Sequence, residues 1–174
     1  MTSSSMTAPI LNIADVELMD LAERARQRGT TMPESRFGGR IGPIGPKIGA
    51  RKLGYNLTEI APGKAAFPKH SHYVNEEMFF VIEGTGELRI GDATHPLRAG
   101  DVIACPPGGP ETAHQLVNTG DAPLRVLAVS TMEWPEICEY PDSGKFLAST
   151  GMQPGDFRHI GRPDAHLDYW DGEG

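Results

Sequence analysis

A series of short segments with period-two alternation, separated by glycine-containing turns, most constrains how this chain can fold. The segments cover residues 52–60, 78–82, 87–90, 94–97, 101–105, 114–118 and 124–130. Among them, residues 78–82 form a continuous apolar run, which predicts a strand covered on both faces. Glycine-containing turns follow several of them, as at Gly84-Thr85-Gly86, Gly91-Asp92 and Gly120-Asp121. Side chains of a strand alternate between the two faces of a sheet, so alternation indicates half-buried strands. Many short strands at close spacing, with little helix, predict an all-β sandwich or barrel.

The 174 residues suit one domain with a sizeable core, which we divide into three parts. Residues 1–50 are an N-terminal extension, residues 51–131 the barrel core, and residues 132–174 a C-terminal strap. In the extension, helical spacing of apolar residues predicts a helix over 15–28, capped by Asp15 and ended by Gly29. Residues 38–49 are rich in glycine and proline and predict a loop or an irregular edge segment.

The C-terminal strap loses periodicity but holds half of the twelve aromatic residues, namely Trp134, Tyr140, Phe146, Phe157, Tyr169 and Trp170. Disordered segments are usually poor in aromatics. We therefore expect an irregular strap that packs on the barrel or on a partner subunit.

Composition excludes several classes of partner. The net charge is −7, from 16 basic and 23 acidic residues, and no basic cluster is present, which argues against nucleic acid. Apolar runs are too short to span a membrane, and the first residues show neither the charged nor the apolar region of a secretory signal. We expect a cytoplasmic protein whose two cysteines, Cys105 and Cys138, remain reduced.

Three histidines and a glutamate form a candidate metal site. His70 and His72 lie two residues apart and therefore share a strand face, Glu77 follows five residues later, and His114 lies in a later segment. Three imidazoles and a carboxylate suit one divalent transition metal such as Fe, Mn, Ni or Zn. A six-coordinate ion would keep open positions, which favours a reactive or substrate-binding centre.

The spacing of these residues resembles the first motif of the cupin superfamily, in which a glycine precedes His-x-His, a glutamate and a second glycine. Gly63, His70, His72, Glu77 and Gly84 occupy these positions. The interval from Gly63 to His70 is one residue longer than in the family pattern.

The second cupin motif is matched by Gly100, Pro106, Gly108, His114 and Asn118. The loop before His114 carries a three-residue insertion relative to the pattern, which leaves the direction of that side chain open. Both motifs in order, over residues 63–118, are a specific signal. The resemblance implies a double-stranded β-helix, or jelly-roll, barrel with His70, His72, Glu77 and His114 as metal ligands.

The chain is similar, more narrowly, to single-domain bacterial cupins, some of them described as sugar-phosphate isomerases. Three stretches carry this likeness, at residues 75–80, 105–110 and 140–145. The resemblance implies an enzyme that acts on a small sugar-like or carboxylated metabolite by Lewis-acid catalysis. An iron-dependent dioxygenase and a non-catalytic binding or sensing module remain alternatives, and the sequence selects no catalytic base. Open strand edges also favour a homodimer.

Other polar residues have simpler interpretations. His95, His159 and His166 are expected at the surface, as are the charges of Lys69, Arg89 and Arg98. Cys105 is expected to pack as a small apolar residue. Tyr73 and Tyr140 are able to act as acid–base groups, but no pattern singles them out.

Overall fold

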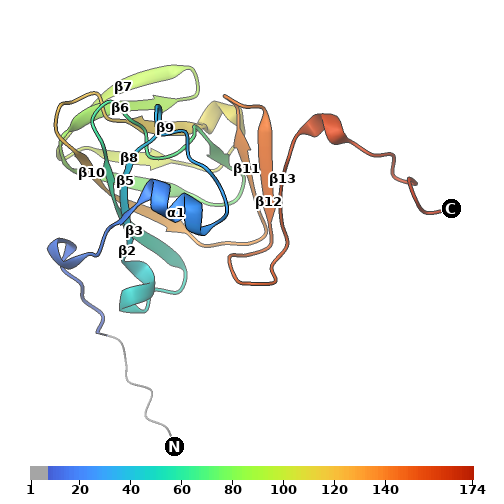
Figure 1. Ribbon diagram of the computed structural model, residues 1–174, viewed down its shortest axis with the longest axis horizontal. Coiled ribbons are helices and arrows are strands. Elements are labelled where there is room, and N and C mark those ends of the chain that lie inside the picture. The colour runs from blue at the N-terminus through green and yellow to red at the C-terminus, as the bar shows by residue number, and fades with distance from the viewer. Residues whose placement is uncertain (1–7) are drawn as a thin grey trace, which may run out of the picture.

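The computed structural model describes residues 8–174, whose regular structure is mainly antiparallel β-sheet (Figure 1). The first seven residues, where no secretory signal is expected, lie outside the described part. The strands that carry the predicted alternation are β3 Leu53–Ile60, β5 Glu77–Glu83, β6 Thr85–Ile90, β7 Ala93–Arg98, β8 Val102–Cys105, β9 His114–Val117 and β10 Leu124–Thr131. Each overlaps a segment predicted from the sequence, and the all-β prediction is confirmed.

Two sheets enclose the main core. One has the strand order β1-β2-β3-β10-β5-β8 and the other the order β7-β6-β9. Both contribute to one buried apolar cluster, which includes Phe79, Val81, Ile103 and Val126 from the first sheet and Leu88, Leu97 and Leu116 from the second. Burying each such side chain stabilises the fold by about 1.5–3 kcal/mol. The inner faces therefore hold the sheets together as a jelly-roll barrel.

Strand β5 shows how the alternation builds this core. Phe79 and Val81 point inward and are buried, whereas Phe80 lies on the outer face with 37% of its surface exposed. The apolar run at 78–82 predicts a strand covered on both faces, and this holds at Ile82, which packs against a second cluster under the N-terminal segment. Phe80 is a half-exposed exception.

The N-terminal segment adds two strands, β1 Met19–Asp20 and β2 Gly39–Pro43, to the edge of the larger sheet. The predicted helix is shorter than expected, because α1 spans Leu21–Gln27 and follows a 3-10 turn, η1, at Ile13–Asp15. Asp20, and not Asp15, caps α1 by accepting hydrogen bonds from the backbone of the first turn. The preceding residues are drawn into strand pairing, which competes with the helix. Gly29, with φ of +70°, follows the helix end as predicted.

The prediction of an irregular segment at residues 38–49 is wrong in its first half. Strand β2 pairs with β3 along its full length, and a 3-10 helix, η2, follows at Gly45–Ile48. The glycines of this segment make the strand difficult to predict from the sequence. The structure nevertheless requires a glycine where the chain passes close to its neighbours. A Cβ at Gly42 would lie 2.4 Å from Val16 Cγ1 and 2.5 Å from the Glu17 carbonyl oxygen, so the chain crosses here in close contact.

The C-terminal segment is more regular than the sequence predicts. Strands β11 Glu136–Tyr140, β12 Lys145–Ser149 and β13 Arg158–Gly161 form a sheet in which β11 also pairs with β4, Ser71–His72. Two further 3-10 turns are η3, Pro110–Thr112, and η4, Pro163–Ala165. The expectation of an irregular strap is therefore wrong for these strands. Beyond β13 the chain extends away from the barrel (Figure 1), with Tyr169 and Trp170 exposed.

Within residues 8–174, no helix has both the length and the apolar character needed to cross a bilayer.

Candidate metal centre

The backbone brings the histidines together at the junction of β4 and β9. His70 and His114 form an isolated antiparallel bridge, with the His70 N–H donating to the His114 carbonyl at 3.1 Å and the reverse bond at 2.8 Å. His72 lies two residues after His70, so both rings share one face of the extended segment. The inserted residues before His114 form η3, and the histidine that follows is buried. The direction left open by the sequence is therefore toward the barrel interior.

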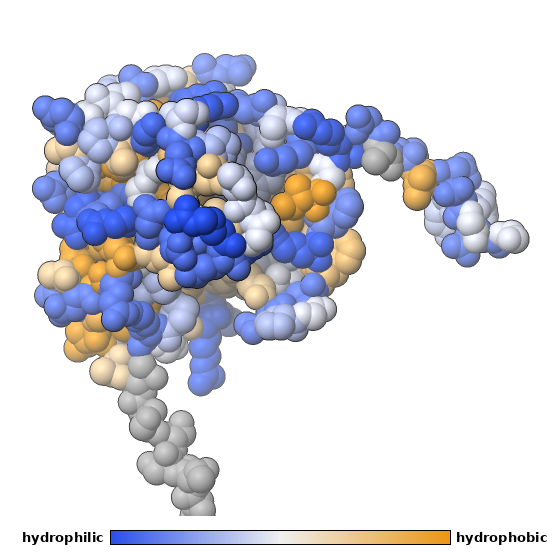
Figure 2. Space-filling model, viewed as in Figure 1, coloured by the Kyte–Doolittle hydropathy of each residue, from blue (hydrophilic) through white to orange (hydrophobic). Residues whose placement is uncertain are grey.

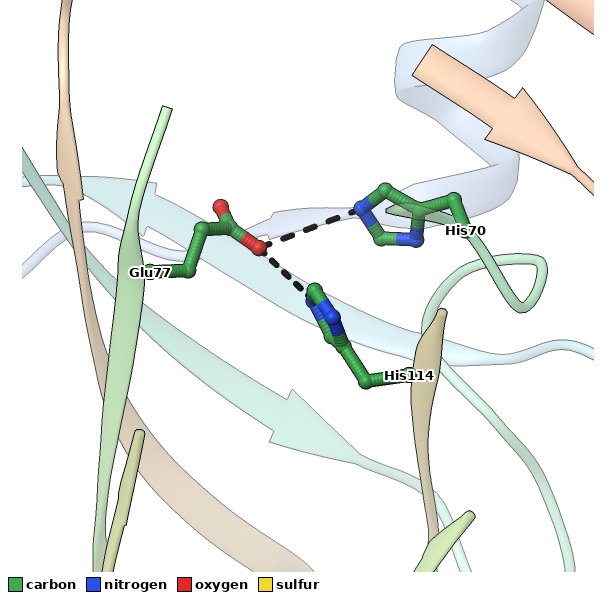
Figure 3. A group of neighbouring side chains, drawn as sticks. All are labelled: His70, Glu77 and His114. Carbon is green, nitrogen blue, oxygen red and sulfur yellow. Dashed lines mark hydrogen bonds and ion pairs between the residues drawn. The ribbon is translucent and has the colours of Figure 1, made fainter. Parts of the chain in front are cut away.

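Glu77, the first residue of β5, supplies a carboxylate at the centre of the three rings. Its Oε2 lies 3.0 Å from the Nε2 of His114, 3.5 Å from that of His72 and 3.9 Å from that of His70. Figure 3 shows the side chains of Glu77, His70 and His114 pointing toward one another from separate segments. The structure thus brings all four predicted residues together, with His70, Glu77 and His114 in one group of possible ligands and His72 in an adjoining group with Glu136 and Cys138.

The other nitrogen of two of the rings faces a backbone acceptor. His70 Nδ1 is 2.9 Å from the carbonyl oxygen of Pro68, and His114 Nδ1 is 3.3 Å from that of Thr112. A carbonyl oxygen only accepts, so each Nδ1 must carry the proton of this bond. The Nε2 of His70 then keeps a lone pair directed at the centre, as in metal-ligating histidines. The Nε2 of His114 contacts the Glu77 carboxylate at 3.0 Å, a hydrogen bond that a metal bound by both residues would replace.

His72 is held on its Nδ1 side by two residues of β11. Its Nδ1 lies 3.4 Å from Glu136 Oε2 and 3.3 Å from Cys138 Sγ. Its Nε2 is buried and has no hydrogen-bond partner among the described residues. A buried polar atom without a partner is costly, so this nitrogen is suited to bind a further group.

Glu136 is a site residue that the sequence does not reveal. The carboxylate is 3% exposed and accepts hydrogen bonds from the backbone N–H groups of Tyr73, Val74, Asn75 and Ile137, and also from the Asn75 side chain. It therefore fixes the turn that joins His72 to Glu77. The one signal in the sequence is that Glu136 and Cys138 lie two residues apart and therefore share a strand face. Polar residues at alternate positions normally indicate an exposed face, so this spacing does not reveal that both residues are buried.

Burial and neighbouring groups shift the pKa values of the cluster in opposite directions. Burial lowers the pKa of His70 to about 4, more than Glu77 raises it, so this ring is neutral at pH 7. Burial also opposes charge on His72, but Cys138, Glu136 and Glu77 together raise its pKa to about 12. Burial alone would raise the pKa of Glu77, yet His114 and His72 hold it well below its usual range. The cluster therefore contains an ionised carboxylate, Glu77, and its surroundings favour a positive charge next to that carboxylate.

Both cysteines lie close to the centre and are buried. Cys105 is opposite Glu77 in the β5–β8 pairing, belongs to the core cluster, and has its pKa raised to about 12 by burial and then by Glu77. It packs as a small apolar residue, as predicted. Cys138 is buried against His72, and both thiols are free. The raised pKa keeps the buried Cys105 thiol protonated, which makes it a poor nucleophile.

The four residues are among those that line a cavity of 260 Å³ in the barrel. Its walls are largely apolar, and its polar positions are Arg24 of α1, Asn56 and Thr58 of β3, and Gln115 of β9. Among the described lining residues, Glu77 supplies the single carboxylate. The cavity is smaller than the ~300–1,000 Å³ typical of drug-sized ligands, so it suits a small metabolite. The sequence alone does not single out Arg24, because an arginine on a short amphipathic helix normally faces solvent.

The other polar residues singled out in the sequence are either exposed or buried in specific contacts. His95, His159 and His166 are exposed, in agreement with the prediction. Lys69 is buried, contrary to the prediction, and its Nζ donates to the Gly91 carbonyl. The Tyr140 ring stacks 6.0 Å from that of His70, and burial raises the pKa of its hydroxyl.

Comparison with known proteins agrees with this geometry. Residues 56–130 match the model of the cupin domain. A sugar phosphate isomerase of the cupin superfamily from Silicibacter pomeroyi is 26% identical, with a TM-score of 0.70 over 94% of this chain and 98% of its own. Residues 56–130 therefore match a cupin domain, and the chain as a whole shares the fold of this cupin-superfamily protein.

Two curated relatives match over shorter stretches. An uncharacterised protein of Methanocaldococcus jannaschii is 34% identical over 35% of this chain, and the match spans less than half, 46%, of that protein's own length. Protein SchB of Streptomyces halstedii is 29% identical over 55% of this chain and 67% of its own. These matches support the family but assign no reaction.

Proposed function

We propose that His70, His72, Glu77 and His114 hold one divalent transition metal, Fe, Mn, Ni or Zn. The observation that carries the proposal is the convergence of three Nε2 atoms within 3.9 Å of a single carboxylate oxygen inside a cavity. The unpartnered Nε2 of His72 and the two carbonyl-held Nδ1 groups fit the same interpretation. These nitrogen and oxygen donors suit a transition metal.

We further propose that the protein is an enzyme acting on a small polar metabolite with a sugar-like carbonyl or a carboxylate. A bound divalent ion would supply Lewis acidity that polarises such an oxygen and stabilises the negative charge developing on it. The chain's own residues orient the substrate. Asn56 and Thr58 of β3 and Gln115 of β9 offer polar contacts in the cavity wall, and the apolar walls exclude water.

Sugar-phosphate isomerisation is the reaction we favour within this class. Its support is the likeness to the Silicibacter pomeroyi protein, which extends over nearly the whole of both chains. Isomerisation also needs a group that moves a proton between neighbouring carbons. Glu77 is engaged at the metal centre, so Tyr140, whose ring stacks 6.0 Å from that of His70, is the residue we would test first for this role.

Metal analysis of His72→Ala tests the proposal. Wild-type protein purified without chelator should contain close to one equivalent of transition metal per chain, and His72→Ala should lose metal and any isomerase turnover together. His95→Ala, which removes an exposed histidine of β7, is the matched control and should keep both. A wild-type protein that takes up none of Fe, Mn, Ni or Zn would refute the metal site. Turnover that survives metal loss would refute the Lewis-acid mechanism.

A further inference from the structure

Arg24 is directed into the cavity from outside the matched cupin domain. It lies on α1, and Leu21, three residues earlier and hence on the same helix face, is buried in the main core cluster. Arg24 itself lines the cavity that contains His70, His72, Glu77 and His114. In Figure 1, α1 crosses in front of the barrel. Residue 24 therefore reaches the cavity of the proposed metal site from the inner face of α1.

The guanidinium of Arg24 has no acidic partner in the described part of the chain. Within residues 8–174, no carboxylate oxygen lies within 4.0 Å of it, and no hydrogen bond from its side chain is formed. Arg26, two residues later, instead points outward and pairs with Glu23 at 2.9 Å. Figure 2 shows that the molecular surface over α1 is strongly hydrophilic, as expected for the outward residues. Arg24 is half-buried without this compensation.

A half-buried cation without a partner costs free energy, which a bound anion would recover. Burial, with a contribution from Arg28, lowers the pKa of Arg24, which reflects the same cost. Glu77 is the single carboxylate among the described lining residues of the cavity, and it contacts the histidines instead of Arg24. A planar guanidinium binds the oxygens of a phosphate or carboxylate in pairs.

We propose that Arg24 binds the anionic group, phosphate or carboxylate, of the substrate and so sets its specificity. The inference rests on the proposed function, since the metal centre would bind the other end of the same small molecule. A guanidinium and a metal ion that share a 260 Å³ cavity would select a short metabolite that carries both an oxyanion and a metal-binding oxygen. A neutral sugar would leave Arg24 unpaired.

Anion binding to Arg24→Gln tests this role without knowledge of the substrate. Inorganic phosphate and malonate are titrated separately into the wild type and the variant, with binding followed by NMR shifts of α1 and cavity residues. Charged hydrogen bonds of ~1.5–3 kcal/mol predict that Arg24→Gln weakens binding of the recognised anion at least about tenfold. The probe that binds distinguishes a phosphate site from a carboxylate site. Arg26→Gln removes the same charge from the outer face of the same helix and should leave binding unchanged.

Further variants separate the outcomes. His72→Ala removes a proposed metal ligand but leaves Arg24, so Arg24-dependent anion binding that survives in it supports the inference even if the metal proposal fails. Arg24→Gln should unfold at the same or a higher temperature than the wild type, because glutamine suits a helix and the uncompensated charge is gone. Equal anion binding by wild type and Arg24→Gln, equal loss in Arg26→Gln, or no binding of either probe to the wild type would overturn the inference.

Discussion

Glu136 should stabilise both the fold and the metal centre, and Glu136→Gln tests this because it removes the charge with little change of size. The carboxylate is buried and accepts five N–H groups of the turn beside His72 and of β11. Burial would raise its pKa, but His72 and Asn75 lower it from 4.5 to about 2. One pKa unit is worth ~1.4 kcal/mol, so the charged form contributes about 3 kcal/mol.

The pH dependence follows from the direction of this shift. A carboxylate with a depressed folded-state pKa contributes stability that is fully present above its unfolded pKa of 4.5 and is lost as the pH falls toward about 2. We expect Glu136→Gln to lower the free energy of unfolding by about 3 kcal/mol at pH 7 and by about 2 kcal/mol at pH 3.5. Urea denaturation in the presence of a chelator measures both values.

The same variant should weaken metal binding. Glu136 accepts from His72 Nδ1 and orients the ring, and loss of such a partner typically costs about 10–100-fold in affinity. Competition with a chromophoric chelator measures this change. Glu133→Gln, an exposed glutamate three residues earlier, is the control for charge. If the two variants match in stability and in metal affinity, the reasoning about Glu136 is wrong.

Three other measurements test the fold and the site. Adding the native metal at 100 times its Kd should stabilise the protein by about 2.7 kcal/mol, which is about 5–10 °C in Tm, and a chelator should reverse it; an unchanged Tm would contradict metal binding to the folded state. Gly42→Ala should destabilise by about 1–3 kcal/mol, since its Cβ meets Val16 and the Glu17 backbone, whereas Gly38→Ala makes only ordinary contacts and serves as control. Light scattering should give twice the 18.8 kDa of one chain if the expected homodimer forms, and a monomer mass would refute it.

The barrel could be predicted because its physical signal is local. Strands such as β5 and β10 bury alternate residues, and period two in the sequence follows directly from that geometry. The spacing of His70 and His72 also predicts that they share one strand face, whereas Glu77 and His114 joined the candidate site through the resemblance to the cupin motifs. The direction of His114 could not be predicted, because it depends on how the inserted residues fold into η3.

The parts that the sequence did not predict depend on contacts between distant segments. Strand β11 is hidden because two of its buried positions, Glu136 and Cys138, are not typical core residues and become satisfied only against the turn beside His72. The start of α1 is set by pairing of Met19 with Ile41, which no local propensity encodes. The position of Arg24 in the cavity wall depends on how α1 packs against the barrel, which the local sequence does not encode.

The C-terminal sheet limits how far the chain can be shortened without loss of metal binding. A fragment ending after Thr131 would retain every residue of the two histidine motifs and the whole segment that matches the cupin domain. It would nevertheless lack β11, the strand that pairs with β4 and carries Glu136. We expect such a fragment to keep the sequence signature of a metal site while losing most of its capacity to retain the ion. Expression boundaries should therefore extend at least through Ser149, the end of the strand that pairs with β11.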